Sequence, residues 1–312
     1  MLKINEKEIP KIAIGTWAWG SGINGSKMIF GESVDKNELK KVFDISIKNG
    51  FNLWDTAAVY GMGNAEKILG EFSKEKEILI STKYTPGKRY SSSKIDKTLN
   101  ESVKRLNGKV PDIYFLHNPL NLELNIKYLI QLLKSKKIAS VGVSNFNLEQ
   151  IKKADNILKQ EGFNLAAVQN HFSLIYRKSE EDGIIDWCKE KNIPFFGYMV
   201  LEQGVLTGKY TKEHGFSIFS RRGIAFPKKR LKKIEPLIEL LEEIGKKYEI
   251  SVANTATVWA ISKNIVPIIG ITKAYQAKEI EKIKNIKLDE NEINILEEVA
   301  EKTGVKVAGS WE

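Results

Sequence analysis

Four residues suited to proton transfer lie near the ends of three successive short apolar runs. Asp55 ends one run, Lys83 follows the next and His117 follows the third, while Tyr60 lies five residues past Asp55. In a parallel barrel, side chains at the carboxyl ends of the strands meet on one face. Carboxylate, phenol, ammonium and imidazole groups are the usual participants in general acid–base catalysis. We therefore expect a site of acid–base chemistry on that face.

Eight runs rich in β-branched residues would provide the strands of such a barrel. Amphipathic stretches separate them, for example at residues 35–49, 91–106 and 125–137, which predicts alternating strands and helices. Eight repeats of this unit favour an α/β fold, a (β/α)8 TIM barrel, with residues 1–312 forming a single domain. The runs are residues 12–15, 52–55, 78–82, 113–116, 140–144, 166–170, 194–198 and 266–270.

Two features are additions to a bare barrel. Residues 2–5 and 7–10 are expected to pair as an N-terminal β-hairpin that closes the barrel bottom. A long loop after strand 7, rich in Gly, Lys and Arg at residues 204–230, precedes helices near 231–247 and 252–262. Long loops on a compact scaffold commonly form lids or binding segments. A last amphipathic stretch, residues 290–302, is expected to pack outside the barrel.

Several segments around these residues resemble motifs of the aldo-keto reductase family. Residues 54–61 read Trp-Asp-Thr-Ala-Ala-Val-Tyr-Gly, similar to the family's Asp-Ser/Thr-Ala signature that closes with Tyr-Gly. Residues 141–146 read Val-Gly-Val-Ser-Asn-Phe, similar to its Gly-Val/Ile-Ser-Asn-Phe motif. Residues 81–83, 116–117, 168–170 and 204–210 resemble further family segments in the same order. The resemblance runs from residue 12 to about residue 276 and implies an NADP(H)-dependent oxidoreductase that reduces aldehydes or ketones to alcohols.

The resemblance assigns a catalytic role to each of the four residues. Tyr60 would donate a proton to the carbonyl oxygen, and His117 would hydrogen-bond that oxygen and orient the carbonyl. Lys83 would favour the phenolate form of Tyr60 and so lower its pKa, because an ammonium stabilises a nearby negative charge. Asp55 would hold Lys83 by an ion pair. Taken singly, each residue also has an ordinary structural explanation, and their combination at three strand ends favours the site.

The resemblance also implies a set of cofactor-binding residues. Ser144, Asn145 and Gln169 would bind the nicotinamide carboxamide, Tyr198 would stack on the ring, and Leu201 closes the same segment. Met199 replaces a serine that is common near the pyrophosphate. NADP(H) is favoured over NAD(H), because Lys273 stands beside the position where a basic residue is often found. The residues expected to hold the adenosine phosphate are Gly270, Thr272, Lys273 and Gln276.

The substrate pocket would be lined by loops at residues 17–32, 86–93 and 118–123. Trp17, Trp19 and Tyr84 are candidate pocket walls, and packing in the core or rim is the alternative for each. Three aromatic side chains would favour an apolar or aryl carbonyl over a sugar.

A different class of function remains open, that of a redox-sensing or regulatory subunit resembling the potassium-channel β subunits. Such proteins keep the cofactor and act through a partner surface. The sequence has no evident partner-binding tail or large apolar surface stretch, which favours an enzyme with a small-molecule substrate, acting as a monomer or weak homo-oligomer.

Composition argues against several other classes of protein. The net charge of +10 comes from lysines scattered among glutamates, which indicates solvated helix faces or a positive rim around an anionic cofactor, not a nucleic-acid surface. No apolar run of about 18 residues is present, so we expect no membrane span. The single cysteine, Cys188, permits no internal disulfide and suggests the cytoplasm. His171 and His214 form no metal-ligand spacing with Cys188, so no metal is expected.

Overall fold

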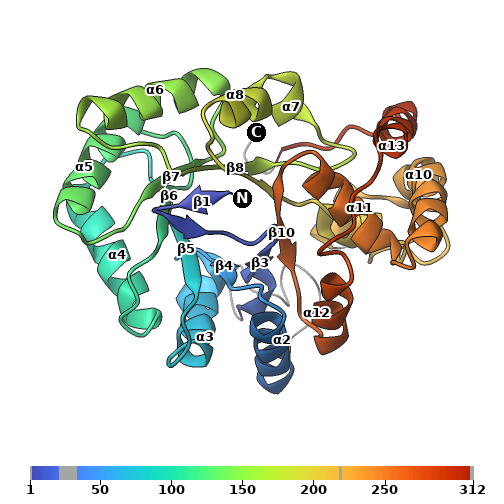
Figure 1. The fold of residues 1–312 in the computed structure, drawn as a ribbon, viewed down its shortest axis with the longest axis horizontal. Helices are drawn as coiled ribbons and strands as arrows, with labels where there is room; N and C mark the ends of the chain where they lie inside the picture. The colour runs from blue at the N-terminus through green and yellow to red at the C-terminus, as the bar shows by residue number, and fades with distance from the viewer. Residues whose placement is uncertain (1, 21–33, 218–219, 310–312) are drawn as a thin grey trace.

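Eight parallel strands close into a barrel, as Figure 1 shows. The computed structural model describes residues 2–20, 34–217 and 220–309. Hydrogen-bonded neighbours follow the order β10-β3-β4-β5-β6-β7-β8-β9, which confirms the predicted (β/α)8 barrel. The strands are β3 (Ala13–Gly15), β4 (Leu53–Asp55), β5 (Leu79–Tyr84), β6 (Ile113–Leu116), β7 (Val141–Ser144), β8 (Ala167–His171), β9 (Phe195–Tyr198) and β10 (Val266–Gly270).

Helices surround the barrel as an outer ring (Figure 1). Most of the longer ones begin at a side chain that caps the first turn, such as Ser91 before α4 and Asn147, whose capping box opens α6. The α-helices are α2 (Lys36–Lys48), α3 (Asn64–Phe72), α4 (Ser92–Arg105), α5 (Leu122–Lys134), α6 (Leu148–Gln160), α7 (Lys178–Glu181), α8 (Ile184–Glu190), α9 (Arg221–Ala225), α10 (Lys228–Lys247), α11 (Val252–Ser262), α12 (Ala274–Glu281) and α13 (Glu290–Lys302).

One predicted helix is shifted along the chain. The sequence indicated residues 125–137, whereas α5 comprises Leu122–Lys134. Asn125 is instead buried inside the helix, and its side-chain amide donates to the Leu120 carbonyl at 2.8 Å. The amide thus satisfies a backbone group of the preceding loop and does not cap the helix.

The strands alternate between two layers of core. Leu53, Leu79, Ile113 and Phe115 point into the barrel, while residues one step along, such as Trp54, pack against the helices. The barrel interior is filled, because a Cβ on Gly142 would lie 2.4 Å from the Phe115 ring. A filled interior leaves the carboxyl ends of the strands as the face on which a site can form.

The N-terminal hairpin consists of β1 (Lys3–Ile4) and β2 (Lys7–Glu8), paired antiparallel. Ile4 and Ile9 belong to the inner core cluster, so the hairpin covers one end of the barrel as the sequence predicted. The segment after β9 is long, also as predicted, and it carries a 3-10 helix, η3 (Glu202–Thr207), before α9. Helix α13 packs beside α10 outside the barrel, where Lys247 binds Glu292 at 2.7 Å.

Within the three described stretches of chain, no helix has both the length and the apolar composition needed to cross a bilayer. The same stretches contain no cluster of three or more His, Cys, Asp or Glu side chains arranged to hold a metal ion.

Candidate active site

Asp55 and Lys83 form a buried ion pair at the carboxyl end of the barrel. Asp55 is the last residue of β4 and pairs in register with Ser81, so Lys83 lies two residues further along β5 on the same inward face. The Lys83 Nζ donates to Asp55 Oδ2 at 2.6 Å and to the Thr56 carbonyl at 2.8 Å. The Lys83 side chain is fully buried. Lys83 is therefore part of the strand itself and not of the loop after it, because β5 extends to Tyr84.

The second carboxylate oxygen of Asp55 is held by neutral donors. Ser81 Oγ donates to Asp55 Oδ1 at 2.7 Å, and Gln169 Nε2 donates to the same oxygen at 3.0 Å. Sequence reasoning missed Ser81. It lies on the same face of β5 as Lys83, so the two-residue period of the strand could have indicated it. Gln169, expected to bind a cofactor amide, donates from its amide nitrogen to the Asp55 carboxylate.

Tyr60 lies against this ion pair. It begins the 3-10 helix η2 (Tyr60–Gly63), and its hydroxyl accepts a hydrogen bond from Lys83 Nζ at 3.4 Å. Gly61 and Met62 follow in left-handed backbone conformations (φ 54° and 55°), which turn the chain sharply after Tyr60. The Tyr60 ring lies 6.4 Å from the His117 ring and 6.1 Å from the Trp17 ring, between centroids. The structure thus brings together all four residues that the sequence singled out.

The electrostatics of the site differ from the expectation for Tyr60. Burial, and next the negative charge of Asp55, raise the pKa of Tyr60 well above 10.0, so the phenol keeps its proton. The net lowering of this pKa expected from Lys83 is not found in this structure, because burial, the larger effect, favours the neutral phenol. Burial lowers the pKa of Lys83 itself, against the attraction of Asp55.

His117 is held from two sides and carries no charge at neutral pH. Burial, and next the Lys83 ammonium, lower the pKa of His117 well below 6.5. Its Nδ1 lies 2.9 Å from Thr85 Oγ1, and its backbone carbonyl accepts from Asn145 Nδ2 at 2.9 Å. Thr85 is a second residue that sequence reasoning missed.

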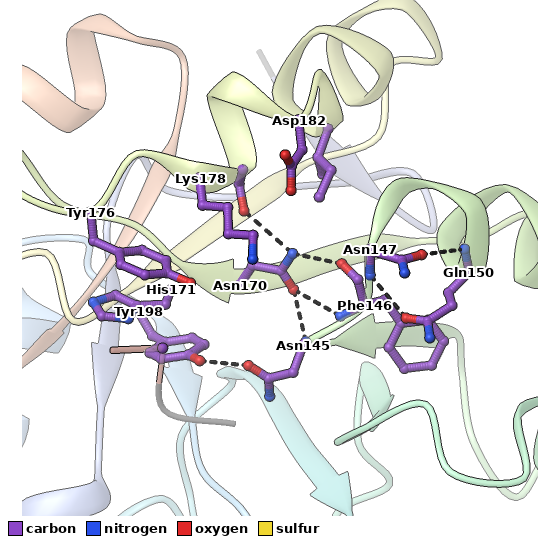
Figure 2. Close-up of a pocket in the computed structure, with 13 residues that line it drawn as sticks. Asn145, Phe146, Asn147, Gln150, Asn170, His171, Tyr176, Lys178, Asp182 and Tyr198 are labelled. Atoms are coloured by element: carbon purple, nitrogen blue, oxygen red, sulfur yellow. Dashed lines mark hydrogen bonds between the residues drawn. The ribbon is translucent and has the colours of Figure 1, made fainter. Parts of the chain in front are cut away.

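Ser144 and Tyr198 are the last residues of β7 and β9, and Asn145 directly follows Ser144; Figure 2 shows Asn145 beside Tyr198. Asn145 Nδ2 donates to Ser144 Oγ at 3.1 Å, and the Tyr198 hydroxyl donates to Asn145 Oδ1 at 2.5 Å. Asn170 fixes this loop, because its Oδ1 accepts from the backbone N–H groups of Asn145 and Phe146. The amide, hydroxyl and ring expected around a nicotinamide are therefore brought together.

A stack of three rings supports Tyr198. His171 stacks on Tyr198 with centroids 5.5 Å apart, and Tyr176 stacks on His171 at 4.0 Å. Buried Glu202 accepts hydrogen bonds from His171 Nε2 at 2.8 Å and from Ser173 Oγ at 2.5 Å. His171 lies two residues past Gln169 on the same strand face, which the strand period could have indicated. Glu202 lies after β9 in a left-handed backbone conformation, and no sequence pattern indicated that it would be buried.

A cavity of about 220 Å³ adjoins this stack. Figure 2 shows its polar lining, which comes from the loop after β7, from β8 and from α7 with Asp182 at its end. Lining residues include Asn145, Asn147, His171, Lys178, Asp182 and Tyr198.

The segment expected to hold an adenosine phosphate lies at the start of α12. The backbone N–H groups of Thr272 and Lys273 both donate to Gln276 Oε1 at 3.0 Å. The next N–H, of Ala274, donates to Glu38 Oε1 of α2 at 2.8 Å. Lys273 is exposed, so its side chain is the available cation of this segment.

Gly270 and Leu201 are the two remaining residues of the expected cofactor set. Gly270 ends β10, is exposed, and has open space where a Cβ would lie. Leu201 is half-buried and directly precedes η3.

The structure revises the expected pocket walls. Trp17, in the 3-10 helix η1 (Trp17–Trp19), lies half-buried beside Tyr60. Trp19 packs in the core against Trp54 and donates from Nε1 to the Ile271 carbonyl at 2.8 Å. Tyr84 is buried on the outward face of β5, one step from inward Lys83. We therefore withdraw Trp19 and Tyr84, and keep Trp17. Most of the expected loop at residues 17–32 lies outside the described residues.

Comparison with known proteins decides the family. A model of the aldo/keto reductase family matches residues 11–301. The chain belongs to the aldo/keto reductase family. It is 31% identical over 290 residues to the chloroplastic pyridoxal reductase of Arabidopsis thaliana, a match that covers 86% of this chain and 77% of the relative. The family assignment makes the chain a member of a family of oxidoreductases.

Solved structures share the fold of this family member. A glycerol dehydrogenase from Gluconobacter oxydans superposes with a TM-score of 0.80 at 22% identity, covering 96% of this chain and 94% of the other. An aldo/keto reductase from Klebsiella pneumoniae, in complex with NADP and acetate, superposes with a TM-score of 0.72 at 20% identity, covering 95% and 94%. At these identities the likeness supports the barrel architecture.

Proposed function

We propose that this chain is an NADP(H)-dependent oxidoreductase that reduces aldehydes or ketones to alcohols, with Tyr60 as the proton donor. The observation that carries the proposal is the contact of the Tyr60 hydroxyl with a fully buried ammonium, Lys83, which is paired with Asp55. Burying an ion pair carries a desolvation cost that its Coulombic attraction often fails to offset, so this arrangement favours a functional role over a stabilising one.

Tyr60 and His117 would act on the two sides of a bound carbonyl oxygen. The high pKa of Tyr60 keeps its proton available across neutral pH. As the proton leaves, the phenolate is stabilised by the Lys83 ammonium at 3.4 Å. Neutral His117 would contribute a hydrogen bond to that oxygen without competing with Tyr60 as a second acid. These residues therefore supply the proton and the orientation that carbonyl reduction needs.

The chemistry of the neighbouring residues fits a nicotinamide cofactor. The amide of Asn145 and the hydroxyl of Ser144 can pair with a carboxamide, and Tyr198 presents a supported aromatic ring. A bound nicotinamide cofactor supplies the hydride. At the other end, the exposed Lys273 would hold a phosphate, with Thr272, Gln276 and Gly270 around it, and Leu201 would contact the cofactor from the segment that also carries Tyr198. The NADP complex of the Klebsiella reductase supports NADP(H) over NAD(H).

We propose an apolar or aryl aldehyde as the substrate. Trp17 lies beside Tyr60, and exposed apolar side chains flank the loops that carry Tyr60 and His117; they are Val59, Met62, Leu120 and Leu124. An apolar rim lowers the cost of desolvating an apolar ligand. The relative named pyridoxal reductase also supports an aromatic aldehyde.

We further propose one domain over residues 1–312, acting in the cytoplasm as a monomer or weak homo-oligomer. Cys188 is buried as a free thiol, and burial raises its pKa to about 12, which suits a structural cysteine in a reducing compartment.

Two measurements on the purified protein test the proposed function. Fluorescence titration with NADPH and with NADH measures cofactor binding, and loss of NADPH absorbance with 4-nitrobenzaldehyde or pyridoxal measures reduction. We expect tighter binding of NADPH and turnover of both aldehydes. Binding without turnover would favour the alternative hypothesis, a cofactor-bound regulatory subunit, over a reductase. Absence of binding would refute both hypotheses.

A further inference from the structure

Thr85 is the first residue after β5 and lies next to His117. Tyr84 and Leu116 are partners in the register between β5 and β6, and the His117 N–H donates to the Tyr84 carbonyl at 2.9 Å. Thr85 lies two positions past inward-facing Lys83, so its side chain also points to the inner face. Pro86 follows, and a residue before proline is confined to extended backbone conformations. The Thr85 hydroxyl lies 2.9 Å from His117 Nδ1.

The neutral imidazole of His117 carries one N–H proton, on either Nδ1 or Nε2. Because burial and Lys83 keep the ring neutral, one nitrogen is a donor and the other is an acceptor. Nδ1 faces Thr85, and Nε2 lies on the opposite side of the ring. The direction of the Thr85–His117 hydrogen bond therefore decides which nitrogen carries the proton.

The two directions have opposite consequences for a carbonyl ligand. If His117 Nδ1–H donated to Thr85, Nε2 would present a lone pair to the carbonyl oxygen, which is also an acceptor. If Thr85 donates to Nδ1, Nε2–H becomes a donor. Among the described residues, His117 Nδ1 is the acceptor that the structure gives the Thr85 hydroxyl.

We propose that Thr85 is a positioning residue of this site: its hydroxyl donates to His117 Nδ1 and thereby fixes the Nε2–H tautomer that binds the carbonyl oxygen. The consequence for the carbonyl rests on the proposed function. The tautomer itself is a property of the protein and can be measured without turnover.

Nitrogen NMR tests the tautomer directly. The chain has three histidines, so a long-range ¹H–¹⁵N spectrum of the uniformly labelled protein at pH 7.5 shows three rings, and comparison with His117→Asn assigns that of His117. We expect the ¹⁵N shifts of a neutral ring with Nε2 protonated and Nδ1 unprotonated. A protonated Nδ1 would overturn the proposal, even if the protein reduces aldehydes. Failure of the proposed function would instead show as absent turnover with the Nε2–H tautomer intact.

A set of three variants tests the role of the hydroxyl. Thr85→Val keeps the shape of the side chain and removes the donor, and Thr85→Ser keeps the donor. Thr98→Val is the matched control, since it removes a threonine hydroxyl bound to the Lys94 carbonyl on helix α4.

Each variant has an expected outcome. For Thr85→Val we expect mixed tautomers of His117 and a fall in kcat of about tenfold, with NADPH affinity within about twofold of wild type, as for loss of one hydrogen bond. Thr85→Ser and Thr98→Val should keep both the tautomer and kcat. Unchanged tautomer and turnover in Thr85→Val, or equal losses in Thr85→Val and Thr85→Ser, would overturn the assignment.

Discussion

Replacing Asp55 by asparagine is expected to make the stability of the protein strongly dependent on pH. The substitution keeps the shape of the side chain and removes the negative charge 2.6 Å from Lys83 Nζ. Both partners are almost fully buried, at 0% and 4% side-chain exposure. Removing one partner of a buried ion pair costs about 3–5 kcal/mol. For 312 residues, 1 kcal/mol corresponds to a shift of about 1.5 °C in Tm, so we expect a loss of about 5–8 °C at pH 7.

The pH dependence follows from the proton on Lys83. Burial already lowers the pKa of Lys83 below 10.5, and the two Asp55 interactions that oppose this are weakened in the variant. In the pH range in which Lys83 is deprotonated in the folded variant and protonated in the unfolded chain, the unfolded state binds more protons. Stability then rises by about 1.4 kcal/mol per pH unit. The gap in Tm between variant and wild type should therefore narrow between pH 7 and pH 9, by up to about 4 °C.

Thermal unfolding followed by tryptophan fluorescence measures this effect, since Trp54 is buried beside Asp55. Lys83→Met is the control, because it lacks the ammonium, and its gap to wild type should not narrow for this reason. A gap for Asp55→Asn that stays constant from pH 7 to pH 9 would refute the reasoning.

Further predictions concern the turn at Tyr60, its proton and the cofactor preference. Gly20→Ala would place a Cβ 2.8 Å from the Cα of Gly61, the residue after Tyr60, and so displace this turn. We expect kcat to fall about tenfold with little change in NADPH affinity. An unchanged kcat would contradict the importance of this close approach. Burial and the nearby carboxylate hold the pKa of Tyr60 well above 10.0, so kcat for reduction should show no phenol ionisation between pH 7 and pH 9.5. A loss of activity centred within that range in wild type, and absent from Tyr60→Phe, would contradict this prediction. Lys273→Ala should weaken NADPH more than NADH in fluorescence titrations, whereas Glu38→Gln should strengthen NADPH selectively by removing an anion from the start of α12. Equal changes for both cofactors would show that neither residue senses the additional phosphate.

The barrel was predictable from sequence because each strand and helix repeats a local pattern. Each of the eight apolar runs overlaps a strand, and the N-terminal hairpin and the helices at residues 252–262 and 290–302 also form as expected. The start of α5 was less predictable, because the helix begins before the apolar positions that indicated it, directly after Asn121 in a left-handed conformation.

The site was predictable where strand ends and motifs indicated it, and less so where burial decides. Asp55, Tyr60, Lys83 and His117 are brought together, but the high pKa of Tyr60 depends on how deeply the fold encloses it. The positions of Trp19 and Tyr84 likewise depend on which face of the barrel wall each side chain takes.

The contact of Thr85 with His117 depends on the register between β5 and β6, and the contacts of Glu202 depend on its left-handed backbone conformation. Neither feature is encoded in the spacing of residue types, so neither residue was among those expected from sequence.

Single-turnover reduction of 4-nitrobenzaldehyde by wild type and Tyr60→Phe, each saturated with NADPH, tests the central claim most directly. If Tyr60 donates the proton, the variant should bind NADPH within about twofold of wild type and react at least about a hundredfold more slowly. A variant that reacts at a rate close to wild type would contradict the assignment of Tyr60 as the proton donor.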